Sequence, residues 1–151
     1  MQEQESIKSI PSNRLQFFPI MMFATIMGLA GLTLVYKRAS EIYNFPSFIS
    51  TIMMIISTVI FFVILYFYIL KIVKHKDEVK KEFSHPIRIN FFAASSISML
   101  LLSMAYRHNI DFVSQMFFIF GAILHIFFTF YTIKFWINNN LEMQHSNPAW
   151  F

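Results

Sequence analysis

The third apolar stretch of the sequence, Ile89 to Tyr106, carries four serines and no charged side chain. At about 100° per residue, these serines occupy less than half of a helical wheel. Serine hydroxyls can replace part of the hydration shell of an ion and still release it, which suits conduction. They can equally bond to their own helix or to a neighbouring helix, and both interpretations stay open. The candidate pore-facing residues are Ser95, Ser96 and Ser98, and Ser103 completes the group.

A second group of small residues lies in the stretch from Leu15 to Tyr36. Ala24, Thr25, Gly28 and Gly31 fall within roughly a third of the helical wheel, so this face can approach another structure closely. The spacing of Ala24 and Gly28 is typical of helices that pack backbone to backbone in lipid. It favours a helix-packing face over a face that lines an ion pathway. Thr25, Gly28 and Gly31 remain candidates for the pathway.

The stretch from Phe112 to Ile133 has one narrow polar stripe among its phenylalanines. In lipid such a stripe must face protein, so we interpret it as a polar packing stripe. Its histidine has no second histidine at helical spacing, which favours a neutral, hydrogen-bonded packing residue over a proton switch or a metal ligand. The stripe consists of Ser114, Gly121, His125, Thr129 and Thr132.

These groups must be positioned by helices that cross a membrane. All 20 charged side chains lie outside four apolar stretches, each near or above the roughly 20 residues that a spanning helix needs. With 56% hydrophobic and 13% charged residues, the chain has no room for a water-soluble catalytic domain. We expect an all-α integral membrane protein with four transmembrane helices, over about 15–36, 47–70, 89–106 and 112–136.

The connections predict how the helices are arranged. The outer loops, 37–46 and 107–111, are short, which favours two antiparallel helical hairpins. One side of the membrane would receive nine Lys and Arg residues and the other three, which predicts that both ends of the chain are cytoplasmic. Residues 1–14 are then a cytoplasmic polar tail, 15–151 the transmembrane region and 71–88 a basic cytoplasmic loop. Topological retention explains that loop better than contact with anionic lipid or an anionic solute.

The first stretch is too long for the apolar core of a signal peptide and lacks an Ala-x-Ala-like cleavage site, so we expect a retained helix. No charge lies inside a span, which argues against a proton relay, a voltage sensor or a carboxylate pair for acid and base chemistry. The sequence has no cysteine, and with it no thiolate nucleophile or ligand. We therefore expect no enzyme, no catalytic residue, no cofactor, no metal site and no nucleic-acid partner for a chain of net charge +4.

Three local motifs resemble a known family. They are Phe18-Pro19 followed by the segment Gly28 to Leu32, the run from His85 to Phe92 leading into Ser96-Ile97-Ser98, and the ending Asn147 to Phe151. Together they resemble the tellurite-resistance/dicarboxylate transporter family, to which the slow-type anion channels of plant guard cells belong. The His-Pro-x-Arg-x-Asn-Phe-Phe run is the most specific part, and the resemblance extends from about Phe17 to the last residue.

That resemblance implies ten transmembrane helices arranged as five hairpins, with the odd-numbered helices around a central anion path. Members are often homotrimers, and their substrates include chloride, nitrate, malate, sulfite and tellurite. By position, the first and third helices here would be inner helices, offering Thr25, Gly28 and Gly31 and the serines at 95, 96 and 98. The second and fourth would be outer helices. Four helices are the first part of such a fold, so we expect an N-terminal fragment.

We therefore expect a segment of an anion channel or transporter that moves small anions across the cytoplasmic (inner) membrane, with the lipid bilayer as its surroundings. The resemblance also implies a homotrimer for the full-length form. The alternative is a non-conducting four-helix membrane subunit that stabilises a partner protein. A self-assembling exporter of cations ranks last, because such proteins usually need an intramembrane carboxylate.

Overall fold

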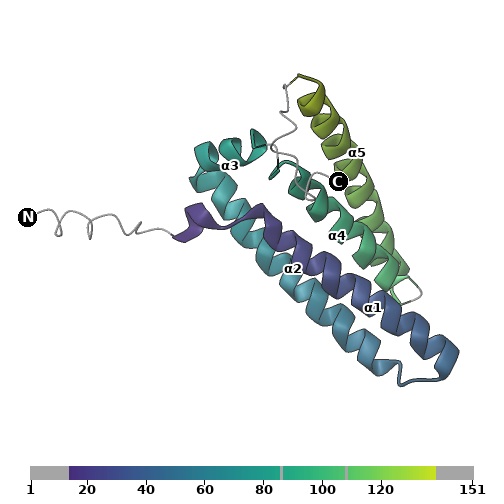
Figure 1. Cartoon of the computed structure of the whole chain (residues 1–151). Coiled ribbons are helices and arrows are strands. Elements are labelled where there is room, and N and C mark those ends of the chain that lie inside the picture. Colours follow the sequence, from purple (N-terminus) through teal and green to yellow (C-terminus); the bar gives the residue numbers. More distant parts are fainter. Residues whose placement is uncertain (1–13, 86, 108, 139–151) are drawn as a thin grey trace, which may run out of the picture.

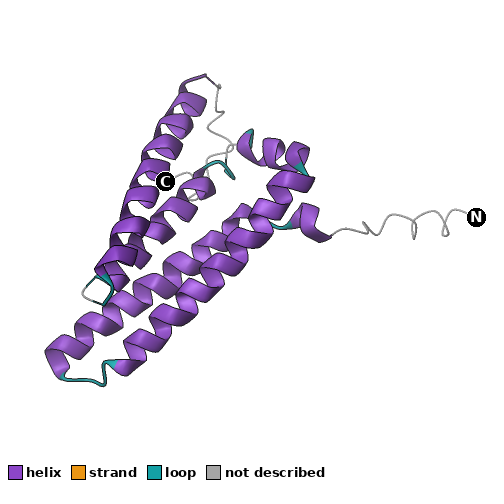
Figure 2. Cartoon of the chain, turned by 180° about the vertical axis from the view of Figure 1, so that it is seen from behind, coloured by secondary structure: helices purple, strands orange, loops and turns teal. Residues whose placement is uncertain are grey.

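The computed structural model describes residues 14–85, 87–107 and 109–138, and every regular element in these ranges is a helix (Figure 1, Figure 2). The expected polar tail, apart from Arg14, and the motif from Asn147 to Phe151 lie outside the described residues. Two short 3-10 turns, η2 and η3, precede the first long helix. The elements are η2 (Arg14–Phe17), η3 (Ile20–Met22), α1 (Phe23–Tyr43), α2 (Phe48–Lys74), α3 (Lys76–Phe83), α4 (Asn90–Tyr106) and α5 (Asp111–Asn138).

Three helical segments are long and apolar enough to cross a membrane. They span Ile20–Tyr43, Phe48–Lys74 and Asp111–Asn138, with 24, 27 and 28 residues. The third expected span corresponds to α4, which is apolar but has only 17 residues. At ~1.5 Å per residue it is about 25 Å long, a few ångströms less than the usual hydrocarbon thickness.

Several helices continue beyond the apolar stretches that predict them. α1 runs on through Lys37 and Arg38 and ends before Asn44, which adopts a left-handed conformation with φ 56°. α2 likewise continues to Lys74, and α3 forms within the segment expected to be a basic loop. Hydrophobicity marks the part of a helix that crosses hydrocarbon, whereas the backbone hydrogen bonds continue into the polar region as long as no breaker intervenes.

α4 is the central helix of the bundle. It packs against α5 along one side and against α1 along another, while α1 also packs against α2 (Figure 1). Phe92, Leu102 and Ala105 of α4 are buried together with Phe23 of α1 and Phe61 of α2. The small residues of α4 allow its neighbours to approach closely, which is how helices associate in lipid.

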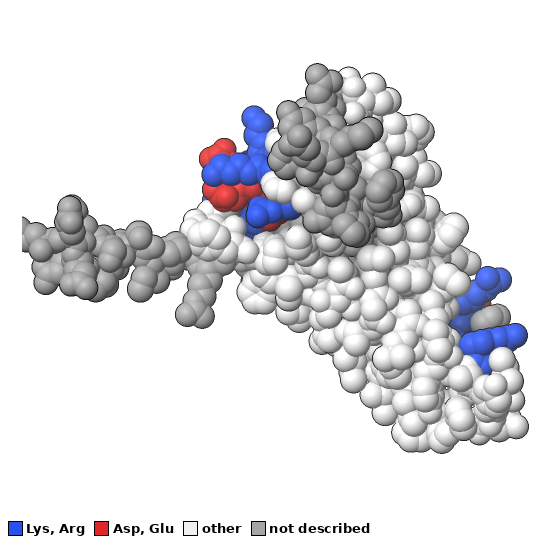
Figure 3. Space-filling model, viewed as in Figure 1, with Lys and Arg blue, Asp and Glu red and all other residues white. Residues whose placement is uncertain are grey.

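The outer helices present large apolar side chains on their surface. α2 exposes Ile52, Val59 and Tyr66, and α5 buries only Phe117 and Gly121 along its 28 residues. On the face shown in Figure 3, charged side chains gather toward the two ends of the body, and the described surface visible between them is white. A broad apolar band between two charged ends is the surface expected of a protein that spans a bilayer.

Candidate functional site

The small residues of α1 divide between an exposed face and a half-buried flank. Thr25 and Gly28 are exposed, and Gly31 is half-buried. A Cβ atom added to either glycine would meet no atom within 4 Å among the surrounding helices. Exposed Leu32 continues the same stripe one turn further along. This face of α1 therefore points away from the packing of the described chain.

The serines of α4 have the opposite placement. Ser96 and Ser98 are fully buried, and Ser95 is half-buried. Ser98 Oγ lies 2.7 Å from the carbonyl oxygen of Ala94 and 3.1 Å from that of Phe23, so its hydroxyl bridges α4 and α1. Among the described residues, Ser95 Oγ donates to the carbonyl oxygen of Phe92 in its own helix. The structure thus brings Ser96 and Ser98 into helix contacts and does not bring them to the exposed face of α1.

The polar stripe of α5 faces α4 over its first half. Ser114 Oγ donates to the carbonyl oxygen of Ser103 at 2.8 Å, and Ser96 Oγ lies 3.0 Å from Nδ1 of His125. Gly121 is buried between these two contacts. A Cβ atom there would lie 3.0 Å from the Cβ of Met99, closer than real Cβ atoms tolerate without a shift of the neighbour. Small size at this position permits the close approach of α4 and α5.

The second half of the stripe lies farther from α4. Thr129 is exposed and donates to the carbonyl oxygen of His125 in its own helix, and Thr132 is half-buried. No cluster of three or more His, Asp or Glu side chains that could hold a metal ion occurs in the described ranges.

A buried ion pair joins the end of α2 to α3. Lys71 Nζ lies 2.8 Å from Glu82 Oε1, and the two side chains are 2% and 5% exposed. Lys71 Nζ also donates to the carbonyl oxygen of Phe18 at 2.8 Å, and the hydroxyl of Tyr68 donates to Glu82 Oε2 at 3.0 Å. The carbonyl group of Phe18 and the side chains of Lys71, Glu82 and Tyr68 thereby form one continuous hydrogen-bonded cluster.

Sequence reasoning assigned these charges to a solvated basic loop and missed the cluster. One signal was present: Tyr68 and Lys71 are three residues apart on α2, so they share a helical face. Their acidic partner lies beyond a turn at His75, where the helix is interrupted, and its position cannot be read from a helical wheel.

Lys37 has a comparable role at the other end of the bundle. Its Nζ donates to the carbonyl oxygens of Ala105 and Arg107, at 3.0 and 2.9 Å, and lies 3.4 Å from Asn109 Oδ1. These carbonyls lie at the C-terminal end of α4, where the last backbone acceptors have no partner within the helix. A cation is favoured there by the helix dipole as well. Lys37 therefore ties α1 to the end of α4.

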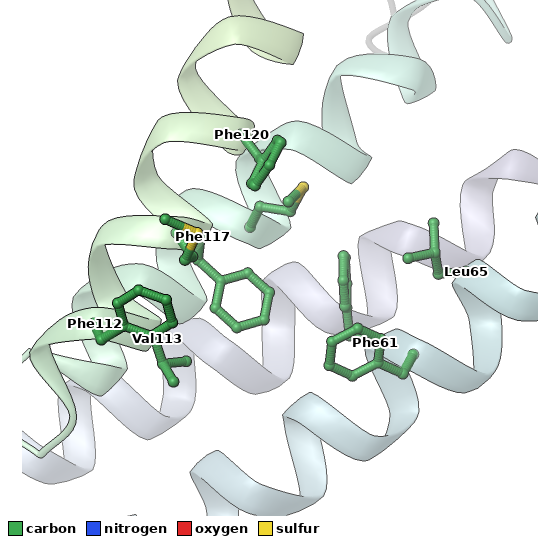
Figure 4. Close-up of a pocket in the computed structure, with 9 residues that line it drawn as sticks. Phe61, Leu65, Phe112, Val113, Phe117 and Phe120 are labelled. Carbon is green, nitrogen blue, oxygen red and sulfur yellow. The ribbon is translucent and has the colours of Figure 1, made fainter.

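An apolar cavity of about 270 Å³ opens between α2, α4 and α5 (Figure 4). The rings of Phe61 and Phe117 meet edge to face in it, with centroids 6.0 Å apart. Leu65 and Phe120 extend its wall, and no charged residue lines it. A cavity of this chemistry, within the apolar band, suits a hydrocarbon chain or an apolar side chain rather than a hydrated anion.

Comparison with known proteins places the chain in a channel family. Residues 17–151 match the family described as voltage-dependent anion channel, and the chain belongs to that family. Its members are channels and transporters, not enzymes. With its apolar helices, the chain is therefore part of an integral membrane protein.

Individual relatives agree with this assignment. The chain is 29% identical to an uncharacterized transporter of Methanocaldococcus jannaschii over 85% of its own length and 39% of the relative's. It is 32% identical to an S-type anion channel of Arabidopsis thaliana over 62% of the chain and 15% of the relative. A tellurite resistance protein TehA homolog of Haemophilus influenzae is 22% identical over 88% of the chain and 41% of the relative. The chain thus spans less than half the length of each of these relatives.

Proposed function

We propose that this chain is a segment of a protein that moves small anions across a membrane through a pore, and that the exposed face of α1 contributes to that pore. Family membership supports the anion as the class of solute. The observation that carries the structural part is the placement of Thr25 and Gly28, which point away from all helices of the described chain.

The chemistry of this face suits weak and broad binding. Gly28 and Gly31 leave the backbone open to close approach, and Thr25 adds a hydroxyl that can solvate an anion. The face offers no fixed positive charge that would hold an anion too tightly to release it. Chloride, nitrate, sulfite and small dicarboxylates share negative charge rather than shape, and this face matches such a class better than one particular anion.

The four apolar helices form two antiparallel hairpins in this proposal, α1 with α2 and α4 with α5. The end that carries α3 is cytoplasmic, because the six Lys and Arg residues between 71 and 88 lie there. The cytoplasmic membrane is the proposed location. Further helices, supplied within the same protein or by an assembly such as a homotrimer, complete the wall of the pore against α1.

The test is anion flux from proteoliposomes. The protein would be expressed from its complete gene, purified and reconstituted into liposomes. Efflux of chloride and nitrate would then be measured, with potassium efflux as the cation control. We expect anion efflux above that of protein-free vesicles and no potassium efflux. A folded, correctly inserted protein that releases neither anion would contradict the proposal and favour a non-conducting subunit that stabilises a partner.

A further inference from the structure

A second cavity, of about 310 Å³, lies at the end of the bundle that carries α3. It is enclosed by the N-terminal turns, the last turns of α2, α3 and the segment before α4. Phe17 and Met21 form an apolar side of its lining. The charged residues of the lining are Lys71, Glu78, Glu82 and Arg88. This cavity lies where charged and apolar surface meet, and Met21 of its lining precedes Thr25 by four residues.

Some hydrogen-bonding groups around the cavity already have partners within the protein, and others have donors to spare. Both carboxylate oxygens of Glu82 already accept bonds, one from Lys71 and one from Tyr68. Lys71 uses two of its three N–H donors, on Glu82 and on the carbonyl oxygen of Phe18. The guanidinium of Arg88 is exposed and makes no hydrogen bond or ion pair with the described part of the chain.

The site therefore offers unused donors, while Glu82 accepts at both of its carboxylate oxygens and Glu78 accepts from Lys81. Glu82 neutralises Lys71, and Lys81, which lies outside the lining, neutralises Glu78 at 2.7 Å. The positive charge of Arg88 is therefore the local excess once both ion pairs are counted. A guanidinium presents its donors in a fork that fits two oxygens of a phosphate or carboxylate. A negatively charged ligand rich in acceptors fits the free donors of Arg88 and Lys71.

The apolar side of the lining favours a lipid over a free oxyanion as the ligand. Phe17 is 64% exposed and Met21 is 40% exposed, so both present hydrocarbon beside the charged groups. A free inorganic anion gains nothing from such a wall. A phospholipid has its phosphate directly next to apolar chains, at the depth where the charged ends of the helices meet the apolar band.

We propose that this cavity binds the phosphate group of an anionic phospholipid, with Arg88 as its main donor and with Phe17 and Met21 against the adjoining acyl chain. Such a lipid bridges the N-terminal turns and the segment before α4. The Lys71–Glu82 cluster joins the same N-terminal turns to α2 and α3. This site is independent of whether the protein conducts anions.

Native mass spectrometry tests the proposal. The protein would be expressed from its complete gene, purified in detergent and released from the detergent in the mass spectrometer. The protein would be titrated with phosphatidylglycerol and, separately, with phosphatidylcholine. We expect phosphatidylglycerol to bind more tightly, and Arg88→Gln to weaken its binding about tenfold, the factor that corresponds to one lost charge-assisted hydrogen bond. Phosphatidylcholine, whose choline cation offsets the charge of its phosphate, should bind weakly to both proteins. Arg88→Lys keeps the charge but loses the fork, so an intermediate affinity is expected.

Lys80→Gln is the matched control, because Lys80 is an exposed cation of α3 that does not line the cavity. Equal losses in Arg88→Gln and Lys80→Gln would mean a diffuse basic surface and would overturn the site. Release of bound phosphatidylglycerol by equimolar inorganic phosphate would mean a free oxyanion site, and would overturn the lipid assignment. Because Arg88 is exposed, its substitution should leave the unfolding temperature of the protein unchanged, which calorimetry would check.

Discussion

Lys71 and Glu82 lie on different helices, eleven residues apart in sequence, and their side chains meet at 2.8 Å with almost no exposure to solvent. Removing two charges from water is expensive, so such a pair persists only where further hydrogen bonds satisfy the remaining donors and acceptors. The hydroxyl of Tyr68 and the carbonyl oxygen of Phe18 provide them here. The pair fixes α3 and the N-terminal turns against the end of α2.

Removing one partner of this pair should be strongly destabilising. Lys71→Met leaves the Glu82 carboxylate buried without its cation, and we expect a loss of about 3 kcal/mol in the free energy of unfolding. The double variant Lys71→Met with Glu82→Leu removes both charges and should recover most of that loss. Denaturant titration in mixed micelles measures both values, and a double variant no more stable than Lys71→Met would contradict the expectation.

The exposed pair on α3 is the control for this experiment. Lys81 Nζ lies 2.7 Å from Glu78 Oε1. That hydrogen bond lowers the pKa of Glu78 and raises the pKa of Lys81. Both groups are open to water, which screens the pair. Lys81→Met should therefore leave the unfolding transition nearly unchanged.

Gly121 should not tolerate a side chain. Gly121→Ala places a Cβ atom 3.0 Å from the Cβ of Met99, which is held close to the backbone of α4 and cannot rotate away. We expect α4 and α5 to separate and the free energy of unfolding to fall by about 1–3 kcal/mol. Gly28→Ala is the matched control, because nothing lies within 4 Å of the added atom there. It should be neutral or slightly stabilising, since alanine favours the helix. Similar losses in both variants would contradict the close approach at Gly121.

The bond between Ser96 and His125 should appear as a coupling energy between α4 and α5. Ser96 Oγ lies 2.8 Å from the carbonyl oxygen of Ala93 and 3.0 Å from His125 Nδ1, so one hydroxyl contacts both. A double-mutant cycle of Ser96→Ala and His125→Phe should give a coupling of about 0.6 kcal/mol, the average for such bonds in membranes. Ser95→Ala with His125→Phe is the uncoupled comparison, because Ser95 bonds within its own helix. Equal couplings in the two cycles would refute the assignment.

α2 and α4 show which parts of the fold can be predicted from the sequence and which cannot. The apolar stretch of α2 predicts a spanning helix because each of its residues must suit hydrocarbon, and that constraint is local. The serines of α4 show the limit. A helical wheel places Ser96 and Ser98 about 160° apart, but it cannot say which neighbour covers each of them. In the structure, α5 covers Ser96 and α1 covers Ser98, a consequence of how four helices pack together.

The Lys71–Glu82 cluster shows a second limit. A count of Lys and Arg treats every charge near a span as solvated, and nothing in the spacing identifies Lys71 as buried. Its burial depends on α3 folding back beside the N-terminal turns, so that Glu82 and the carbonyl oxygen of Phe18 reach the same ammonium group. Tertiary contacts of this kind connect segments whose separation in sequence has no periodic signature.

The exposed face of α1 provides the sharpest test of the proposed pore. Gly28→Phe adds a bulky apolar side chain where the described helices leave open space, so the fold should accept it. If this face lines the anion path, the ring narrows and dehydrates the path, and chloride efflux from proteoliposomes should fall to a small fraction of its original rate. Val59→Phe, on an exposed position of α2, adds a similar ring to the outer surface and should leave efflux unchanged.

Stability and flux must be measured on the same samples, because a misfolded variant would also lose transport. We expect Gly28→Phe to keep the unfolding temperature of the unsubstituted protein while losing efflux, since no atom lies within 4 Å of the added Cβ and Gly28 is exposed. Unchanged efflux in a stable Gly28→Phe protein would mean that α1 presents this face to lipid or to another helix. The anion path would then have to be formed elsewhere, and the small residues of α1 would be packing residues, as the spacing of Ala24 and Gly28 favours.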